Sequence, residues 1–186
     1  LPICWIDQFF SPLMMGGWEA LSPTQDLIDA YECTDGKSIG ESKLYNPEKP
    51  FENRDPRLAY SILWHGCEFG GQIYSTEGTM GNGNATRTGY TMRKYINPKN
   101  VGNEYPGWIN YILFRYAEVL LIYAEAQNEL SGPDASVYEA VNKVRQRPSV
   151  ELPPLPANLT KDQMREAIRR ERRVEFTFEG IHLFET

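Results

Sequence analysis

The stretch Arg115-Tyr-Ala-Glu-Val-Leu-Leu-Ile-Tyr-Ala-Glu-Ala126 decides the fold of this chain. It lies in a predicted helix from about Trp108 to Leu130, which Ser131-Gly132-Pro133 ends, because glycine accepts a left-handed cap and proline cannot continue a helix. Large apolar side chains recur at helical spacing along one stripe: Ile112, Tyr116, Val119, Leu120 and Tyr123. Small alanines adjoin this stripe, so we expect it to be buried against other helices.

Two later segments predict helices that pack against this stripe. The first runs from about Asp134 to Gln146, and the short turn before it predicts an antiparallel helical hairpin. The second begins at Thr160, where Gln163 completes a capping box and Leu159 and Met164 fit a hydrophobic staple. The four prolines of residues 148–156 predict an extended linker between these two helices. The expected fold class is therefore mainly α.

The chain before residue 108 predicts long loops with short elements. Ser22 and Pro23 predict the start of a short helix that buries Leu27, Ile28 and Tyr31. Residues 36–58 are predicted to form a loop, which an ion pair within Arg54-Asp55-Pro56-Arg57 holds in place. Residues 58–65 and 90–96 have strand character and flank a glycine-rich excursion, Gly66 to Gly89, in which we expect a hairpin.

Composition excludes several classes of function. The net charge of −6 argues against nucleic acid, whose backbone recruits basic patches. The three cysteines and two histidines lack metal-ligand spacing, and no nucleophile or phosphate-binding loop motif is present. No cofactor is therefore expected. Charged residues interrupt the longest apolar region, so no transmembrane helix is predicted.

Charged side chains recur on the predicted helices, and they allow two interpretations. One is a structural ion network, because bidentate guanidinium–carboxylate pairs neutralise both partners and hold helices in register. The other is a carboxylate pair that performs acid–base chemistry on a glycosidic bond. The abundance of arginine favours the network. Its predicted members are Arg115, Glu118, Glu125, Arg145, Arg169, Glu171, Arg172 and Glu175.

Aromatic residues flank the glycine-rich excursion and form the candidate ligand site. The flat C–H face of a sugar stacks on an exposed ring, and a rigid ring supplies contact area at small entropic cost. The alternative is that each ring only anchors its loop in the core. The candidate stacking residues are Trp64, Tyr74, Tyr90, Tyr105 and Trp108. Gln72, Asn82, Asn84 and Arg87 are available as polar partners for the hydroxyl groups of a sugar.

Five blocks of the sequence resemble, in order, the C-terminal region of the SusD/RagB family of surface glycan-binding lipoproteins. Three of these blocks are Arg115–Ala126, Val141–Arg147 and Leu159–Glu185; the two upstream blocks are Leu21–Glu32 with Asp35-Gly36-Lys37, and Asn53–Leu58. The chain departs from the family pattern at His182 and Glu185, where arginine and aspartate are usual. The resemblance implies a SusD-like fold with a tetratricopeptide-like helical hairpin core.

The resemblance also implies an organisation and a function. Residues 1–186 would be the C-terminal part of one SusD-like domain, with a loop-rich, ligand-facing part over 21–107 and a helical core over 108–186. A lipid anchor and an N-terminal helical half would lie before residue 1. We expect a non-catalytic protein at the surface of the outer membrane that passes oligosaccharides to a SusC-like TonB-dependent transporter. A peptide-binding protein and a purely protein-interacting helical-repeat adaptor are the alternatives, ahead of a carboxylate-pair glycosidase.

Overall fold

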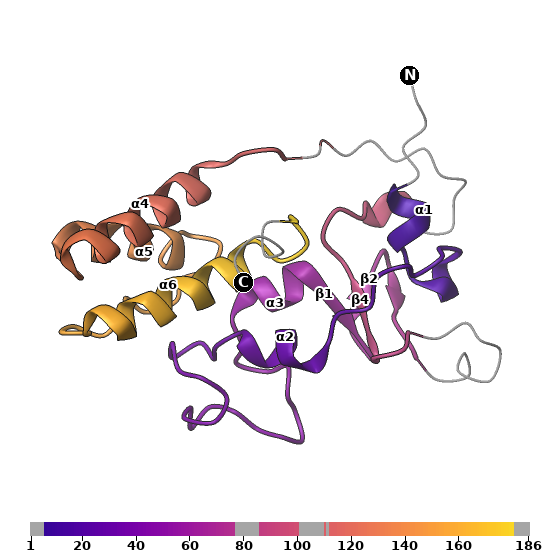
Figure 1. Ribbon diagram of the computed structural model, residues 1–186. Coiled ribbons are helices and arrows are strands. Elements are labelled where there is room, and N and C mark those ends of the chain that lie inside the picture. Colours follow the sequence, from indigo (N-terminus) through magenta and orange to yellow (C-terminus); the bar gives the residue numbers. More distant parts are fainter. Residues whose placement is uncertain (1–5, 77–85, 101–109, 111, 181–186) are drawn as a thin grey trace. The chain divides into compact units, whose positions relative to one another are not determined.

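The computed structural model describes residues 6–76, 86–100, 110 and 112–180 (Figure 1). The chain divides into two compact units. The strand unit comprises Leu1–Ile28 and Ala59–Tyr111, and the helical unit comprises Asp29–Leu58 and Ile112–Thr186. Residues 29–58, which the sequence placed with the loop-rich part, thus belong to the helical unit. The two units are described separately below.

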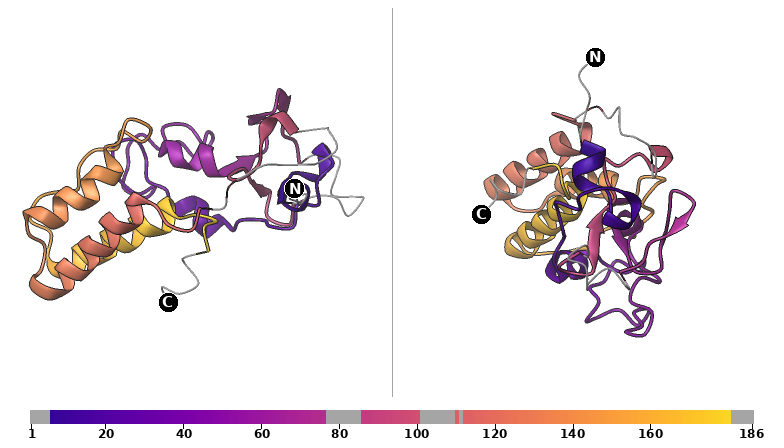
Figure 2. Two further views of the ribbon diagram at one scale, coloured as in Figure 1. Left: turned by 90° about the horizontal axis from the view of Figure 1, so that it is seen from above. Right: turned by 90° about the vertical axis from the view of Figure 1, so that its right-hand side faces the viewer.

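Three helices build the helical unit and lie side by side in Figures 1 and 2: α4 (Tyr116–Ser131), α5 (Ala135–Arg145) and α6 (Lys161–Glu175). The α4–α5 hairpin predicted from the short turn is confirmed, and so is the mainly α fold. Apolar side chains from all three helices form one buried cluster, which includes Leu121, Val141 and Ile168.

The predicted end of the first long helix is confirmed, but its predicted start and its predicted buried stripe are wrong. Helix α4 begins at Tyr116 instead of Trp108, because Arg115 before it has an extended backbone (φ −146°, ψ 159°). The buried residues of α4 are Leu121, Ala124 and Asn128. The expected stripe faces outward instead, and its exposed members are Ile112, Tyr116, Val119 and Tyr123, while Leu120 is partly buried against the core. The buried face is the one carrying smaller side chains, which lets α5 and α6 approach.

The predicted starts of α5 and α6 are confirmed. Asp134 caps α5 by accepting hydrogen bonds from the backbone nitrogens of Ser136 (2.8 Å) and Val137 (3.1 Å). Thr160 and Gln163 form the capping box of α6. At its other end α6 stops at Glu175, and Phe176, the next residue, packs into the core.

Two short helices cross the division between the units. Helix α2 (Gln25–Ala30) starts later than the predicted cap at Ser22, whose hydroxyl instead accepts a hydrogen bond from Thr86. Helix α3 (Pro56–Ser61) occupies residues that the sequence assigned to the start of a strand. Asp55 precedes it and accepts a hydrogen bond from the backbone nitrogen of Arg57 (2.9 Å), while Pro56 takes the first helical position.

The strand unit contains two small antiparallel sheets. Strand β1 (Ile62–Trp64) pairs with β4 (Tyr90–Met92), and β2 (Glu68–Phe69) pairs with β3 (Gln72–Ile73). The predicted hairpin is therefore present; its Gly70 and Gly71 both have positive φ, at 61° and 77°, as a tight hairpin turn requires. Helix α1 (Ile6–Phe10) and the 3-10 turns η1 (Leu13–Met15) and η3 (Pro98–Asn100) complete the described elements.

Candidate ligand-binding surface

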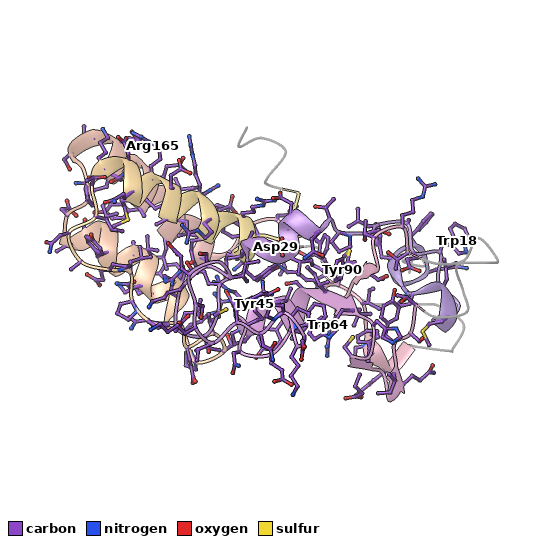
Figure 3. All side chains as sticks on the ribbon, turned by 90° about the horizontal axis from the view of Figure 1, so that it is seen from below. Trp18, Asp29, Tyr45, Trp64, Tyr90 and Arg165 are labelled. Atoms are coloured by element: carbon purple, nitrogen blue, oxygen red, sulfur yellow. The ribbon has the colours of Figure 1, made fainter. Side chains whose placement is uncertain are left out.

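The β1–β4 ladder places two of the predicted stacking residues together. Trp64 lies directly opposite Tyr90 in the antiparallel register, so the two side chains project from the same face of the sheet. Both are half-buried. The Tyr90 hydroxyl donates a hydrogen bond to the side-chain oxygen of Gln25 (2.6 Å), which fixes the orientation of its ring. Trp64 and Tyr90 thus form a partly exposed aromatic pair, labelled in Figure 3.

Tyr74 lies in the core of the strand unit and not on its surface. Its side chain is only 2% exposed and packs with Leu63, Phe69 and Ile96. Its hydroxyl bonds Thr91 (2.8 Å) and the carboxylate of Glu19 (3.0 Å). Burial is the largest cause of a strongly raised pKa of this phenol. We therefore leave Tyr74 out of the candidate surface, because a ring enclosed by core side chains has no face available to a sugar.

Other predicted candidates lie outside the described residues. These are Tyr105 and Trp108, and the amides Asn82 and Asn84 of the excursion. The remaining polar candidates, Gln72 on β3 and Arg87, are exposed. Phe9 and Trp18 were not predicted as stacking residues, because the prediction was confined to rings that flank the excursion. The rings of both are exposed.

Buried carboxylates of α6 form the centre of the charged network in the helical unit. Glu171 accepts hydrogen bonds from Arg57 Nη1 on Oε1 (2.5 Å) and from Arg145 Nη1 on Oε2 (2.9 Å). Glu175 accepts on Oε2 from Arg57 Nη1 (2.9 Å) and Arg147 Nη1 (2.8 Å), and on Oε1 from Arg115 Nη1 (2.6 Å). All four oxygens of the two carboxylates are thus engaged by guanidinium groups.

The network extends from α6 into the loops and neighbouring helices. Arg57 pairs with Asp55 (2.7 Å), Arg145 with Glu32 (2.7 Å) and Arg115 with Glu179 (2.8 Å). Within the described ranges, its ion pairs join five arginines and five acids: Arg57, Arg115, Arg145, Arg147 and Arg170 with Glu32, Asp55, Glu171, Glu175 and Glu179. The charges therefore balance.

The remaining predicted members lie outside this centre. Arg169 pairs with Glu166 on the surface (3.0 Å), and Arg172 approaches Glu125 only to 3.9 Å. Glu118 sits in the first turn of α4 and is half-buried. Helical spacing could not distinguish these positions from the central ones. Three members that lie outside the long helices, Glu32, Asp55 and Arg57, are absent from the predicted network.

The electrostatics of Glu175 suit a permanent ion pair better than acid–base catalysis. Burial raises the pKa of its carboxyl group, but the charges of Arg147 and Arg57 and the hydrogen bonds outweigh burial and lower that pKa to about 2. A glycosidase acid instead needs a raised pKa and contact with the substrate. The arrangement of Glu171 and Glu175 can hold α6 against the loop of residues 29–58, and it offers no free carboxylate to a sugar.

A polar pocket of about 390 Å³ lies on the surface of the helical unit. Its lining combines guanidinium groups with carboxylates and one hydroxyl: Asp29, Glu32, Ser38, Glu166, Arg169, Arg170 and Arg173, with Ala30. Two of the arginines already bind acids of the lining, since Arg170 pairs with Glu32 (2.8 Å) and Arg169 with Glu166. The pocket is therefore close to neutral and suits a small polar molecule better than an anion.

The part of the chain that the structure describes has neither a candidate metal centre nor a membrane-spanning helix. No group of three or more His, Cys, Asp or Glu side chains there is placed to hold a metal ion. None of its helices combines the length and apolar character that a membrane span requires.

Solved structures of SusD-like proteins share the fold described above, a mainly α architecture with a helical hairpin. The chain belongs to that class, the SusD family, whose family model matches residues 4–185. The match explains why the five sequence blocks occur in the family's order, and it confirms the predicted family membership.

Several relatives resemble this chain. A SusD-like carbohydrate binding protein from Bacteroides fragilis NCTC 9343 superimposes with a TM-score of 0.81 at 33% identity, over 97% of this chain and 37% of its own. A second SusD-like protein from that strain gives a TM-score of 0.76 at 31% identity, over 94% of this chain and 38% of its own. SusD-like protein P2 of Formosa agariphila is 44% identical over 75 residues, which are 38% of this chain and 15% of that protein.

Proposed function

We propose that this chain is part of a non-catalytic carbohydrate-binding protein. It captures oligosaccharides at the surface of the outer membrane and passes them to a SusC-like TonB-dependent transporter. The observation that carries the proposal is the likeness to the B. fragilis SusD-like carbohydrate binding protein, with its TM-score of 0.81 and 33% identity. Because this chain spans only 37% of that relative, the function belongs to the full-length protein.

The Trp64–Tyr90 pair supports the proposal at the level of residues. The two rings stand side by side on a sheet face, and both remain partly open to solvent. A sugar ring could stack on one of them while its hydroxyl groups bind nearby polar side chains. The described carboxylates at the centre of the charged network support the absence of catalysis, since Glu171 and Glu175 are bound by arginines.

Titration calorimetry of the full-length protein tests this proposal. The probes are hexasaccharides of α-1,4-glucose, β-1,4-glucose, β-1,4-xylose and β-1,4-mannose. We expect at least one to bind without releasing shorter sugars, and Trp64→Ala to weaken that binding about tenfold. Tyr60→Ala is the matched control, because Tyr60 is an exposed ring of the same unit outside the pair. Shorter products would indicate a hydrolase and contradict the proposal.

A purely protein-interacting adaptor is the second candidate, and the outer face of α4 favours it. Tyr116, Val119 and Tyr123 lie at helical spacing on that face, and each is at least 43% exposed. Apolar surface of this kind marks interaction sites. Absence of binding to every hexasaccharide, together with capture of a transporter from solubilised outer membranes that Val119→Asp abolishes, would favour the adaptor.

A further inference from the structure

Residues 8–20 fold back on themselves in the strand unit. The backbone nitrogen of Trp18 donates to the carbonyl oxygen of Gln8 (2.7 Å), and that of Ala20 donates to the carbonyl oxygen of Phe9 (2.8 Å). Gly17 makes the close approach possible, because a Cβ atom there would lie 2.2 Å from the carbonyl oxygen of Ser11. The backbone alone therefore fixes the separation of residues 9 and 18.

This fold brings two aromatic rings together at the surface. The rings of Phe9 and Trp18 meet edge to face, with centroids 4.8 Å apart and an interplanar angle of 81°. Trp18 is nevertheless 56% exposed and Phe9 is 43% exposed. An edge-to-face contact holds the ring orientations and leaves ring surface open to solvent. We call Phe9 and Trp18 the aromatic platform.

The next residue, Glu19, anchors the platform to the core of the strand unit. Its carboxylate accepts hydrogen bonds from the hydroxyls of Tyr74 (3.0 Å) and Thr91 and from the backbone nitrogen of Leu13 (3.4 Å). The backbone of Glu19 has a φ of 46°, a region that costs free energy for any residue but glycine. These hydrogen bonds offset that cost and tie the residue next to Trp18 to the core of the strand unit.

Met14, which lies between the two rings in the sequence, contacts a polar segment of the strand unit. The sulfur of Met14 accepts a hydrogen bond from the backbone nitrogen of Ser75 (3.1 Å), which ties η1 to the chain after β3. The next residue, Thr76, bonds the exposed imidazole of His65 through its backbone nitrogen (3.3 Å). The exposed aromatic surface itself matches a pyranose, which presents apolar C–H faces that stack on a ring.

We propose that Phe9 and Trp18 bind the apolar face of a pyranose ring of an oligosaccharide. The inference rests on the proposed carbohydrate-binding function and assigns a second contact to it, apart from the Trp64–Tyr90 pair. Figure 3 shows Trp18 at the margin of the strand unit, well separated from Trp64. Of the two platform rings, Trp18 offers more stacking surface, because it is 56% exposed and Phe9 is 43% exposed. The orientation of both rings is fixed before binding, so little conformational entropy is lost when a sugar binds.

The test uses the full-length protein and the hexasaccharide that binds it in calorimetry. We expect Trp18→Ala to weaken binding about tenfold, and Trp18→Phe, which keeps a planar ring, to weaken it no more than about threefold. Tyr60→Ala should leave the affinity unchanged. If Trp18→Ala fails to fold, as judged by circular dichroism, Trp18→Leu replaces it, since leucine keeps apolar volume without a flat ring.

The outcomes separate this inference from the proposed function. Unchanged hexasaccharide affinity in a folded Trp18→Ala protein would overturn the platform and leave the carbohydrate function intact. Loss of affinity in both Trp18→Ala and Trp18→Phe together with a lowered melting temperature would show a merely structural role, and would also overturn the platform. Failure of the wild-type protein to bind any hexasaccharide would overturn the carbohydrate function itself.

Discussion

Helices α4 and α6 pack into the same cluster but distribute their side chains in opposite ways. Helix α6 buries the charged Glu171 and Glu175 and exposes little apolar surface. Helix α4 turns Tyr116, Val119 and Tyr123 outward and buries the polar Asn128, whose amide donates to the carbonyl oxygen of Lys161 (3.1 Å). The comparison shows that the side chains available in the interior decide which face of a helix is buried. Paired charges fill the interior along α6, and small side chains fill it along α4.

The largest effect is expected from removing one of the buried charges of α6, which tests the first half of this comparison. Glu171→Gln removes the charge between Arg57 and Arg145 and leaves two buried guanidinium groups under-neutralised. We expect it to lower the free energy of unfolding by about 3–5 kcal/mol. Urea unfolding of the full-length protein measures this. Glu166→Gln is the control, because the exposed Glu166–Arg169 pair should contribute below about 1 kcal/mol. Equal losses would refute the distinction.

A second experiment compares the two faces of α4. Leu121→Ala opens a cavity in the buried cluster and should cost about 2–5 kcal/mol. Val119→Ala on the outer face should cost less than about 1 kcal/mol, because Val119 is exposed in the described unit. Urea unfolding of both variants checks the contrast. A large loss in Val119→Ala would mean that another segment of the full-length protein buries the outer face.

Acid should weaken the helical unit through the buried carboxylate of Glu175. The folded-state pKa of Glu175 is lowered from 4.5 to about 2, so its contribution is fully present above pH 4.5 and disappears as the pH falls towards 2. We expect that loss to reach about 3 kcal/mol across this interval. Melting temperatures measured by circular dichroism at pH 7, 4 and 3 test it. Glu166→Gln should retain the wild-type acid sensitivity, and a pH-independent melting temperature would contradict the assignment.

The smallest effect concerns how the two helices begin. Helix α6 has a capping box at Thr160, whereas Arg115 gives α4 no side-chain cap. Thr160→Ala should lower the free energy of unfolding by about 1 kcal/mol, because backbone N–H groups of the first turn lose their acceptor. Thr160→Ser should restore most of it. A wild-type stability in Thr160→Ala, measured by urea unfolding, would show that packing alone fixes the start of α6.

The sequence predicted the elements that are determined by residues close together in the chain. Thr160 and Gln163 are three residues apart, and Gly70-Gly71 lies within one hairpin, so short-range rules sufficed. The orientation of α4 could not be predicted in this way. Its apolar stripe at Tyr116, Val119 and Tyr123 is real, but hydrophobicity alone does not say that Leu121 and Ala124 fit the available space better.

The candidate site shows the same distinction between features set by local sequence and features set by distant contacts. The Trp64–Tyr90 pair follows from two strand-like segments that flank one excursion, and their pairing was within reach of the sequence. The exposure of Trp18 depends on Gly17 contacting Ser11 and on Glu19 reaching Tyr74, a residue distant in sequence. The network partners Glu32 and Arg57 likewise lie in segments that no periodic pattern connects to α6. Contacts of this kind are set by the tertiary fold.

The ion network also constrains the order in which the chain can fold. Arg57 and Glu171 are separated by 114 positions, Glu32 and Arg145 by 113, and the hydroxyls of Tyr31 and Thr177 by 146. During synthesis, Glu32, Asp55 and Arg57 therefore leave the ribosome long before their partners on α5 and α6. The helical unit cannot close around residues 29–58 until Glu179 has been made. Such non-local contacts slow folding, so this loop is expected to wait in an unfolded and protease-sensitive state.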